Sequence, residues 1–405
     1  MLTAGLIFAA TYAVVAFGRL PYLRIDRTGA AIVGAVLMVV SGALTLDQAW
    51  AAIDHRTLLL LFGMMVLIAS LRLARFFRTV ARLVVTRLVH PAATLTAVVF
   101  TTGVLSALFV NDTICLVFTP ILIEVATLRG HRPLPYLLAL ATASNIGSVA
   151  TITGNPQNML IGSVSGLSYA QFTQALAPVA LVGLAIDAAV IWWFFRHELT
   201  THPVAPMHTP SHAVHRWLMI KTMVVTVAVL VGFLAGVDPA LVAMAAAAVL
   251  LVTRTVHPEK LYGRIDWDLL MLFVGLFVVI EGVEHVGLVE RVFAMVTPLG
   301  LQSPLGLGVV AAVLSNLISN VPAVMLFTHV IPTWPNPDSA WLMLAMASTL
   351  AGNLTLVGSI ANLIVLQGAR RHGVAFSFWD YTRIGLPVTL ATLAFGMLWL
   401  MWVAR

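Results

Sequence analysis

The chain alternates between long apolar segments and short charged loops. About 17–20 apolar residues suffice to cross a bilayer as a helix. Two further apolar stretches, 92–127 and 304–332, carry polar residues at their centres. We expect these two to be re-entrant hairpins that enter and leave on the same side. Spanning helices are predicted near residues 2–18, 29–46, 57–73, 135–163, 171–195, 217–235, 239–253, 267–285, 339–368 and 380–403.

The segment 138–162 is polar at its centre although its flanks are apolar. Gly147, Gly154 and Pro156 each weaken or interrupt a helix. At membrane depth, unpaired backbone groups are tolerated only where they are buried in protein or line a wet cavity. We therefore predict a helix that unwinds at mid-depth and resumes, as in the broken helices that form substrate and ion sites in secondary transporters.

The two halves of the chain resemble each other. Asn111 and Asn320 lie 209 positions apart in similar surroundings, and Asn145 and Asn353 lie 208 apart. Each copy holds five crossings and one hairpin, and because five is odd the second copy must be inverted. The predicted fold is an all-α polytopic membrane protein with two inverted repeats, each of five transmembrane helices plus one re-entrant hairpin, and with broken helices at mid-membrane.

The repeats set the expected domain boundaries. Residues 197–216 are rich in His and Pro, and we expect a cytoplasmic linker there rather than a metal site. The first repeat is 1–196, with scaffold helices 1–90, hairpin 92–127, broken helix 135–163 and helix 171–195. The second is 217–405, with scaffold helices 217–300, hairpin 304–332, broken helix 339–368 and helix 380–403.

Composition agrees with a protein that is almost entirely membrane domain. The chain is 60% hydrophobic and 9% charged, with a mean hydropathy of +0.99, whereas soluble domains carry about 25% charged residues. Most Arg residues fall in alternate loops and in a basic amphipathic helix at 72–90, which we expect at the cytoplasmic surface. This places both termini outside a bacterial plasma (inner) membrane, and the basic balance is no nucleic-acid signature.

Asp112, at the centre of the first hairpin, is the leading candidate for coupling. Burial of a carboxylate is costly unless it is protonated, paired or bound to a cation. We predict that Asp112 carries a coupling proton, although Asn-Asp-Thr is also good helix-capping chemistry and both roles can hold together. Val321 takes the corresponding place in the second copy, so a single coupling carboxylate is expected.

The remaining reactive groups are expected to be structural. Asp187, Glu281 and Glu284 are interpreted as locally paired or water-facing. Cys115 alone can form no internal disulfide and is interpreted as a small buried hydrophobe.

The predicted cavity lining is made of amides, hydroxyls and helix ends, with no Arg or Lys. Such a lining suits a small neutral polyhydroxyl solute, while an anion could still be held by helix N-termini. The candidate substrate-binding residues are Asn111, Thr113, Ser144, Asn145, Thr153, Asn155, Asn158, Ser319, Asn320, Asn353, Thr355, Ser359 and Asn362.

These motifs resemble the ion-transporter superfamily, and within it the ArsB/NhaD-type permeases. Phe109-Val-Asn-Asp-Thr113 with Phe118-Thr-Pro-Ile121 is similar to the first hairpin of bacterial arsenite-efflux permeases. Ser144-Asn-Ile-Gly147 with Thr153-Gly-Asn-Pro-Gln-Asn158 is similar to the broken helix of the group, and 352–363 is similar to its second copy.

The resemblance implies a homodimer with an elevator mechanism that exchanges arsenite or antimonite for protons. It also implies a separate ATPase subunit for some members. This chain lacks a Gly-x-x-x-x-Gly-Lys-Ser/Thr stretch of its own, so any use of ATP would be by such a partner. The Asn111-Asp112 order weakens the sodium–proton antiporter alternative, and a dicarboxylate or related anion transporter stays open. We expect no enzyme activity, because no His-Glu-x-x-His motif is present, and no cofactor, resident metal or nucleic-acid partner.

Overall fold

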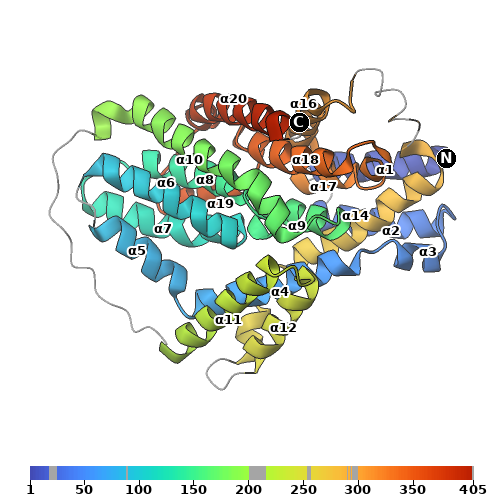
Figure 1. Cartoon of the computed structure of the whole chain (residues 1–405), viewed down its shortest axis with the longest axis horizontal. Helices are drawn as coiled ribbons and strands as arrows, with labels where there is room; N and C mark the ends of the chain where they lie inside the picture. Colours follow the sequence, from blue (N-terminus) through green and yellow to red (C-terminus); the bar gives the residue numbers. More distant parts are fainter. Residues whose placement is uncertain are drawn as a thin grey trace.

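The computed structural model describes residues 1–17, 25–87, 90–199, 216–252, 257–289, 291, 293 and 300–403. Within these ranges the chain forms α-helices and short 3-10 turns and no strand, so the all-α expectation is confirmed. The molecule is elongated: α1, α2, α3 and α14 lie towards one end, and α5, α6, α7, α8 and α10 towards the other (Figure 1). The helices are α1 (Leu2–Phe17), α2 (Arg27–Val40), α3 (Leu46–Ala51), α4 (His55–Leu73), α5 (Phe76–Arg87), α6 (Pro91–Leu108), α7 (Asn111–Leu128), α8 (Leu134–Ser148), η1 (Ile152–Gly154), α9 (Pro156–Val164), α10 (Tyr169–Leu199), α11 (Arg216–Leu234), α12 (Pro239–Leu251), α13 (Pro258–Tyr262), α14 (Trp267–His285), α16 (Pro304–Ile318), α17 (Asn320–Met325), η3 (Ile331–Thr333), α18 (Pro337–Ala351), α19 (Ile360–Arg371) and α20 (Phe378–Val403).

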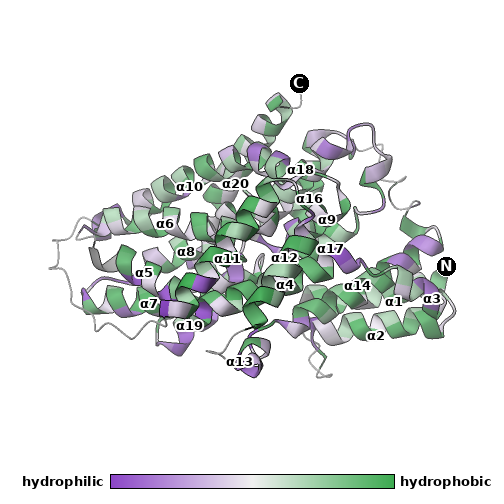
Figure 2. Ribbon diagram, turned by 60° about the horizontal axis from the view of Figure 1, so that its bottom comes forward, coloured by the Kyte–Doolittle hydropathy of each residue, from purple (hydrophilic) through white to green (hydrophobic). Residues whose placement is uncertain are grey.

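The helices have the length and composition of a multi-pass membrane protein. Among the described residues, α4, α6, α7, α10, α11 and α20 are long and apolar enough to cross a bilayer, and α1, α2, α12 and α16 are shorter apolar helices. Figure 2 shows hydrophobic residues along most of α4, α11 and α12, with hydrophilic residues gathered in short connecting elements such as α13.

Four helices of the two halves begin in the same way. An aspartate at the N-cap of α2, α4, α12 and α14 accepts a hydrogen bond from a backbone N–H of the first turn. Such caps satisfy donors that the helix itself leaves unpaired. Asp26 and Asp238 are 212 positions apart, as are Asp54 and Asp266, so the capping chemistry is repeated along the chain.

The same offset relates two close helix contacts. A Cβ at Gly63 of α4 would lie 2.6 Å from the carbonyl oxygen of Ala243 in α12. A Cβ at Gly275 of α14 would lie 2.7 Å from the carbonyl oxygen of Ala31 in α2. Both positions require glycine because another residue's Cβ would overlap the neighbouring backbone. Each half therefore supplies one glycine to an interlocking contact with the other.

Helix breaks separate the arms of both predicted hairpins. The range 92–127 covers α6 and α7, which meet at the extended residues Phe109 and Val110. The range 304–332 covers α16 and the short α17, which meet at Ser319 with φ 78° and ψ 155°. The second arm of this hairpin is one short helix of six residues followed by turns, so the two hairpins differ in build.

Both predicted broken helices are interrupted in the structure. The range 135–163 contains α8, the short η1 and α9, and the range 339–368 contains α18 and α19. The predicted linker 197–216 falls mostly outside the described ranges: α10 continues to Leu199 and α11 starts at Arg216, and neither the residues between them nor 290, 292 and 294–299 are described.

Candidate functional site

Asn145, on α8, is the centre of a buried hydrogen-bond network. Its Oδ1 accepts from Asn111 Nδ2 at 2.9 Å and from Ser359 Oγ at 3.0 Å. Its Nδ2 donates to Asn353 Oδ1 at 2.8 Å and to Asn362 Oδ1 at 3.2 Å. All five side chains are buried. The Asn145 network, as we call these five residues, joins the tip of the first hairpin to both broken helices.

Neighbouring groups fix the orientation of this network. Asn353 Nδ2 donates to the carbonyl oxygen of Thr142 at 3.0 Å, and Tyr381 OH lies 3.5 Å from Asn353 Oδ1. Cys115 Sγ donates to Ser144 Oγ at 3.1 Å, which keeps the thiol in the protein interior. A buried polar network holds its geometry when its members are satisfied in this way.

Each broken helix is braced across its gap by an asparagine. Asn158 Nδ2 donates to the carbonyl oxygens ten and seven positions before it, both at 3.0 Å. Asn362 Nδ2 donates to the carbonyl oxygens ten and seven positions before it, at 2.8 and 3.2 Å. Because the end of a helix leaves carbonyls without partners, these side chains satisfy the groups that the break exposes.

The two half-helices that follow the breaks begin with matching side-chain caps. Asn155 Oδ1 accepts from the Asn158 N–H at 2.9 Å at the start of α9, and Ser359 Oγ accepts from the Ala361 N–H at 3.2 Å at the start of α19. The sequence forms helix ends here because Asn and Ser compete well for first-turn N–H groups.

A second polar group, separate from the Asn145 network in its hydrogen bonds, surrounds Thr349 of α18. Thr349 Oγ1 accepts from Asn155 Nδ2 at 3.3 Å and from Gln157 Nε2 at 3.2 Å. Thr153 Oγ1 lies 3.0 Å from Tyr169 OH. We call Thr349, Asn155 and Gln157 the Thr349 group. It ties the start of α9 to the second broken helix, while the contact between Thr153 and Tyr169 separately joins η1 to α10.

Asp112 lies in the first turn of α7 and lines a cavity of about 160 Å³. The cavity also contains Thr113, Pro156 at the start of α9 and Ile360 at the start of α19. The N-terminal turns of three helices therefore line one space, and the positive ends of their dipoles favour negative charge there. Asp112 is consequently held beside positive helix ends rather than in an apolar wall alone.

Arg72 and Arg264 also line this cavity, and this corrects the prediction of a lining without Arg or Lys. Both arginines, with Lys260 and Asp266, line a wider outer cavity of about 580 Å³. Arg72 lies in the last turn of α4 and Arg264 precedes α14, so the packing of these helices brings both arginines to the cavity that Asp112 lines. The sequence carried no local signal for this approach.

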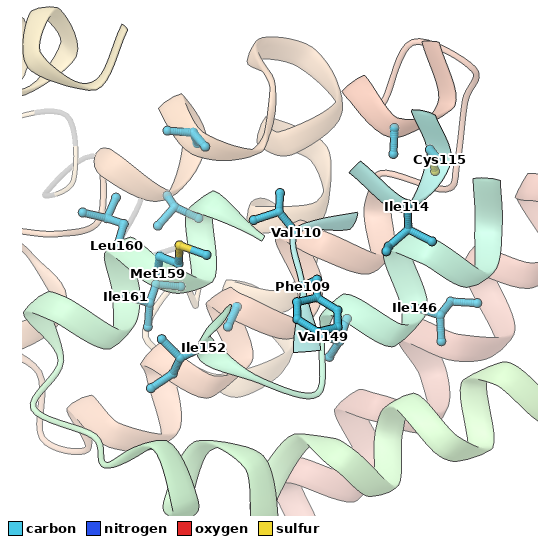
Figure 3. Close-up of a cluster of buried hydrophobic side chains, with 14 of the residues drawn as sticks. Phe109, Val110, Ile114, Cys115, Ile146, Val149, Ile152, Met159, Leu160 and Ile161 are labelled. Carbon is cyan, nitrogen blue, oxygen red and sulfur yellow. The ribbon is translucent and has the colours of Figure 1, made fainter. Parts of the chain in front are cut away.

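Apolar side chains enclose the polar tip of the first hairpin. Phe109, Val110 and Ile114 belong to one buried cluster with Val149 and Ile152 of the broken helix. Figure 3 shows these side chains together with Met159 and Leu160 of α9. Hydrogen bonds and charge effects are stronger in such water-poor surroundings.

The structure divides the predicted binding residues among several places. Asn111, Asn145, Asn353, Ser359 and Asn362 meet in one network, and the Ser144 side chain instead accepts from Cys115. The other candidates do not bond to the Asn145 side chain. They are Thr113 in the Asp112 cavity, Thr153, which contacts Tyr169, Asn155 in the Thr349 group, Asn158 in its brace, Ser319 at the second tip, Asn320, which accepts from Ser315, and Thr355, which donates to Asn316 at 3.4 Å.

Three residues of these polar groups are not among the predicted binding residues. They are Tyr381, whose OH lies near Asn353, and Thr349 and Gln157, which bond to each other. Asp187 is fully buried on α10 beside Thr142 and away from the Asp112 cavity. Glu281 and Glu284 approach His329 instead of the substrate candidates.

Comparison with known proteins agrees with this architecture. Residues 12–336 match the CitMHS family, described as "Citrate transporter". The silicon efflux transporter LSI3 of Oryza sativa subsp. japonica is 32% identical, over 96% of this chain and 95% of the relative. The putative transporter arsB of Dictyostelium discoideum is 23% identical, over 93% of this chain and 87% of the relative.

Among solved structures, the YdaH transporter of Alcanivorax borkumensis superposes with a TM-score of 0.63 at 16% identity, covering 100% of this chain and 97% of YdaH. This likeness shows the fold, which the crystal structure's description calls an unusual topology. The expected place in the ion-transporter superfamily, among ArsB/NhaD-like proteins, is confirmed. With a family match over most of its length, a transporter relative at 32% identity and a transporter fold, the chain belongs to the CitMHS family of membrane transporters.

Proposed function

We propose that this protein is a proton-coupled secondary exporter of small polyhydroxylated metalloid solutes, with arsenite and antimonite as its substrates. Support comes from the Asn145 network, whose amides and hydroxyl offer both donors and acceptors. A neutral trihydroxide needs several of each, because every hydroxyl can donate and accept. Further support comes from the relative named as a silicon efflux transporter and from the one named putative transporter arsB.

In this proposal the substrate exchanges hydrogen bonds with the network. Asn111 and Ser359 both donate to one oxygen of Asn145. A substrate hydroxyl can replace Asn111 or Ser359 as a donor to Asn145 Oδ1. Opening the network to the substrate then costs little free energy, because the buried amide oxygen keeps its hydrogen bonds. Asn353 and Asn362 are then available from the second broken helix.

Asp112 is proposed to carry the proton. Its carboxylate lines the cavity at the tip that also bears Asn111. Protonation neutralises the Asp112 carboxylate, which lies beside three helix N-termini. Substrate binding at the adjacent Asn111 competes with this protonation. Competition of this kind between proton and substrate produces exchange rather than co-transport.

Movement is proposed to follow an elevator mechanism in a homodimer. The glycine contacts of α4 with α12 and of α14 with α2 suit a rigid scaffold, and the hairpins and broken helices would move against it as the transport domain. A separate ATPase subunit and a bacterial inner membrane with external termini belong to the same proposal. The observation that most strongly supports the proposed function is the hydrogen bonding of Asn145 to both Asn111 and Asn353.

The test is flux into proteoliposomes that contain only this protein. We expect an imposed pH gradient, without sodium or ATP, to drive accumulation of radioactive arsenite, and antimonite to compete. Absence of arsenite movement in vesicles with folded protein would overturn the proposed substrate. Flux that ignores the pH gradient would overturn the proton coupling alone.

A second candidate function is transport of a carboxylate or oxyanion, and a specific observation favours it. Arg72 and Arg264 line the cavity that ends at Asp112, and guanidinium groups bind carboxylates in a bidentate fashion. The family described as citrate transporters points to the same class. Sodium-stimulated citrate or dicarboxylate flux that Arg72→Gln and Arg264→Gln abolish would support this candidate.

A further inference from the structure

Two glutamates and a histidine meet far from the proposed substrate site. Glu281 and Glu284 are three residues apart on α14 and so share one face of that helix. His329 follows α17 and lies between them, with Nδ1 2.6 Å from Glu284 Oε2 and Nε2 3.9 Å from Glu281 Oε2. One potential ligand atom from each residue lies within 4.8 Å of the others.

The cluster is accessible from solvent. The side chains are 39% exposed for His329 and about 32% for Glu281 and 31% for Glu284. Glu281 and Glu284 stand towards the C-terminal end of α14, whereas Leu269 near its N-terminal end lines the Asp112 cavity, about 18–23 Å away along the helix. A ligand here cannot touch the Asn145 network.

The charges of the cluster favour a divalent cation. Two carboxylates with a neutral imidazole carry two negative charges, and protonation of the imidazole removes only one of them. A divalent ion with neutral histidine matches the charge of the two carboxylates. Carboxylate oxygens and one imidazole nitrogen are also ordinary ligands of Zn²⁺.

We propose that Glu281, Glu284 and His329 form a site for a divalent transition-metal ion, best matched by Zn²⁺. Tetrahedral Zn²⁺ places its ligand atoms roughly 3.3 Å apart. The two observed separations of 2.6 and 3.9 Å lie on either side of that value. Rotation of the half-exposed His329 ring presents one nitrogen to the ion, and water supplies the fourth ligand.

The bound ion would connect α14 to the segment that follows α17 of the second hairpin. If α14 belongs to the fixed scaffold and the hairpin moves, Zn²⁺ would hold them together and inhibit transport. This inhibitory effect rests on the proposed elevator mechanism. Metal binding itself does not, because it can be measured without any substrate.

The experiment measures Zn²⁺ bound to the metal-stripped full chain in detergent, by calorimetric titration with zinc chloride. We expect His329→Gln and Glu284→Gln each to bind one equivalent fewer than the wild type. His285→Gln is the matched control, since His285 is an exposed neighbour on α14 outside the cluster, and it should keep full stoichiometry. The histidines of the 197–216 stretch are the same in every variant and cancel in the comparison.

Equal zinc stoichiometry in the wild type and in His329→Gln would overturn the site and leave an ion-pair cluster only. If either variant elutes as misfolded protein, the milder Glu281→Gln and X-ray absorption at the zinc edge of the wild type replace it. A first shell of oxygen ligands with a single imidazole supports the site, and a shell with several imidazoles assigns the zinc to the linker. Loss of binding without any change in zinc sensitivity of transport would overturn the inhibitory role alone.

Discussion

The two broken helices use the same brace but end in different surroundings. Asn158 and Asn362 donate to carbonyls at identical sequence separations. Asn362 Oδ1 then accepts from Asn145, whereas Asn158 Oδ1 is buried without a hydrogen-bond partner among the described residues. The hairpin tips also differ in one polar group, since Asp112 of the first tip corresponds to the apolar Val321 of the second.

This comparison teaches that the framework is duplicated and the chemistry is not. The aspartate caps of the scaffold recur at an offset of 212 positions, and the glycine contacts recur at the same offset with almost the same distances. The amide network is centred on Asn145 of the first half, although three of its five residues come from the second half, and the carboxylate lies at the tip of the first hairpin. A symmetric frame therefore holds an asymmetric site.

The largest effect is expected from the position at which the tips differ. Asp112→Asn removes the titratable group, so accumulation driven by a pH gradient should fall to background while exchange at equal pH persists. The measurement is arsenite flux in proteoliposomes with and without the gradient. Val321→Thr is the control at the matching position of the second tip and should keep coupling. Coupling that survives Asp112→Asn would exclude Asp112 as the proton carrier.

The second prediction compares the two corresponding asparagines of the broken helices. Asn145→Ala leaves four side chains of its network without their partner, and Asn353→Ala removes fewer hydrogen bonds. A buried group left unsatisfied costs about 1–3 kcal/mol, so we expect Asn145→Ala to lower the free energy of unfolding by about 3 kcal/mol and Asn353→Ala by less. Thermal unfolding in detergent measures both, and an equal loss would contradict a network centred on Asn145.

The third prediction tests the symmetry of the scaffold. Gly63→Ala and Gly275→Ala each place a Cβ against the backbone of the facing helix. Overpacking of this kind costs about 1–3 kcal/mol, and we expect nearly equal destabilisation from the two changes. Gly236→Ala is no suitable control because its φ of 79° brings strain of its own. Unequal losses at Gly63 and Gly275 would show that the halves do not share the contact equally.

The smallest expected difference lies between the two braces. Asn158→Ala removes two donated hydrogen bonds, and Asn362→Ala removes two donated bonds and one accepted from Asn145. We expect Asn362→Ala to be more destabilising by about 1 kcal/mol, the net worth of one hydrogen bond. Parallel denaturation of the two variants measures the difference, and the reverse order would sink the comparison.

The helix breaks could be foreseen because their cause is local. Gly154 and Pro156 interrupt a helix wherever it packs, and Asn or Ser after the break caps the next helix. The meeting of Asn111 with Asn145 was also within reach, since both lie at expected interruptions. The approach of Arg72 to Asp112 was not, because it depends on how distant helices pack. Which asparagine oxygen finds a partner depends on side-chain orientation, which no spacing encodes.

The two hairpin tips also differ in backbone conformation, because Ser319 of the second tip has a positive φ. Its φ of 78° and ψ of 155° lie in a region that is nearly restricted to glycine, while Phe109 and Val110 of the first tip have ordinary extended angles. Such a conformation costs about 1–3 kcal/mol, which corresponds to a factor of about 5–150 in population. Ser319→Gly should therefore slow hydrogen exchange at this tip. The second tip stores energy that the first does not, and within one transport cycle we expect it to rearrange earlier.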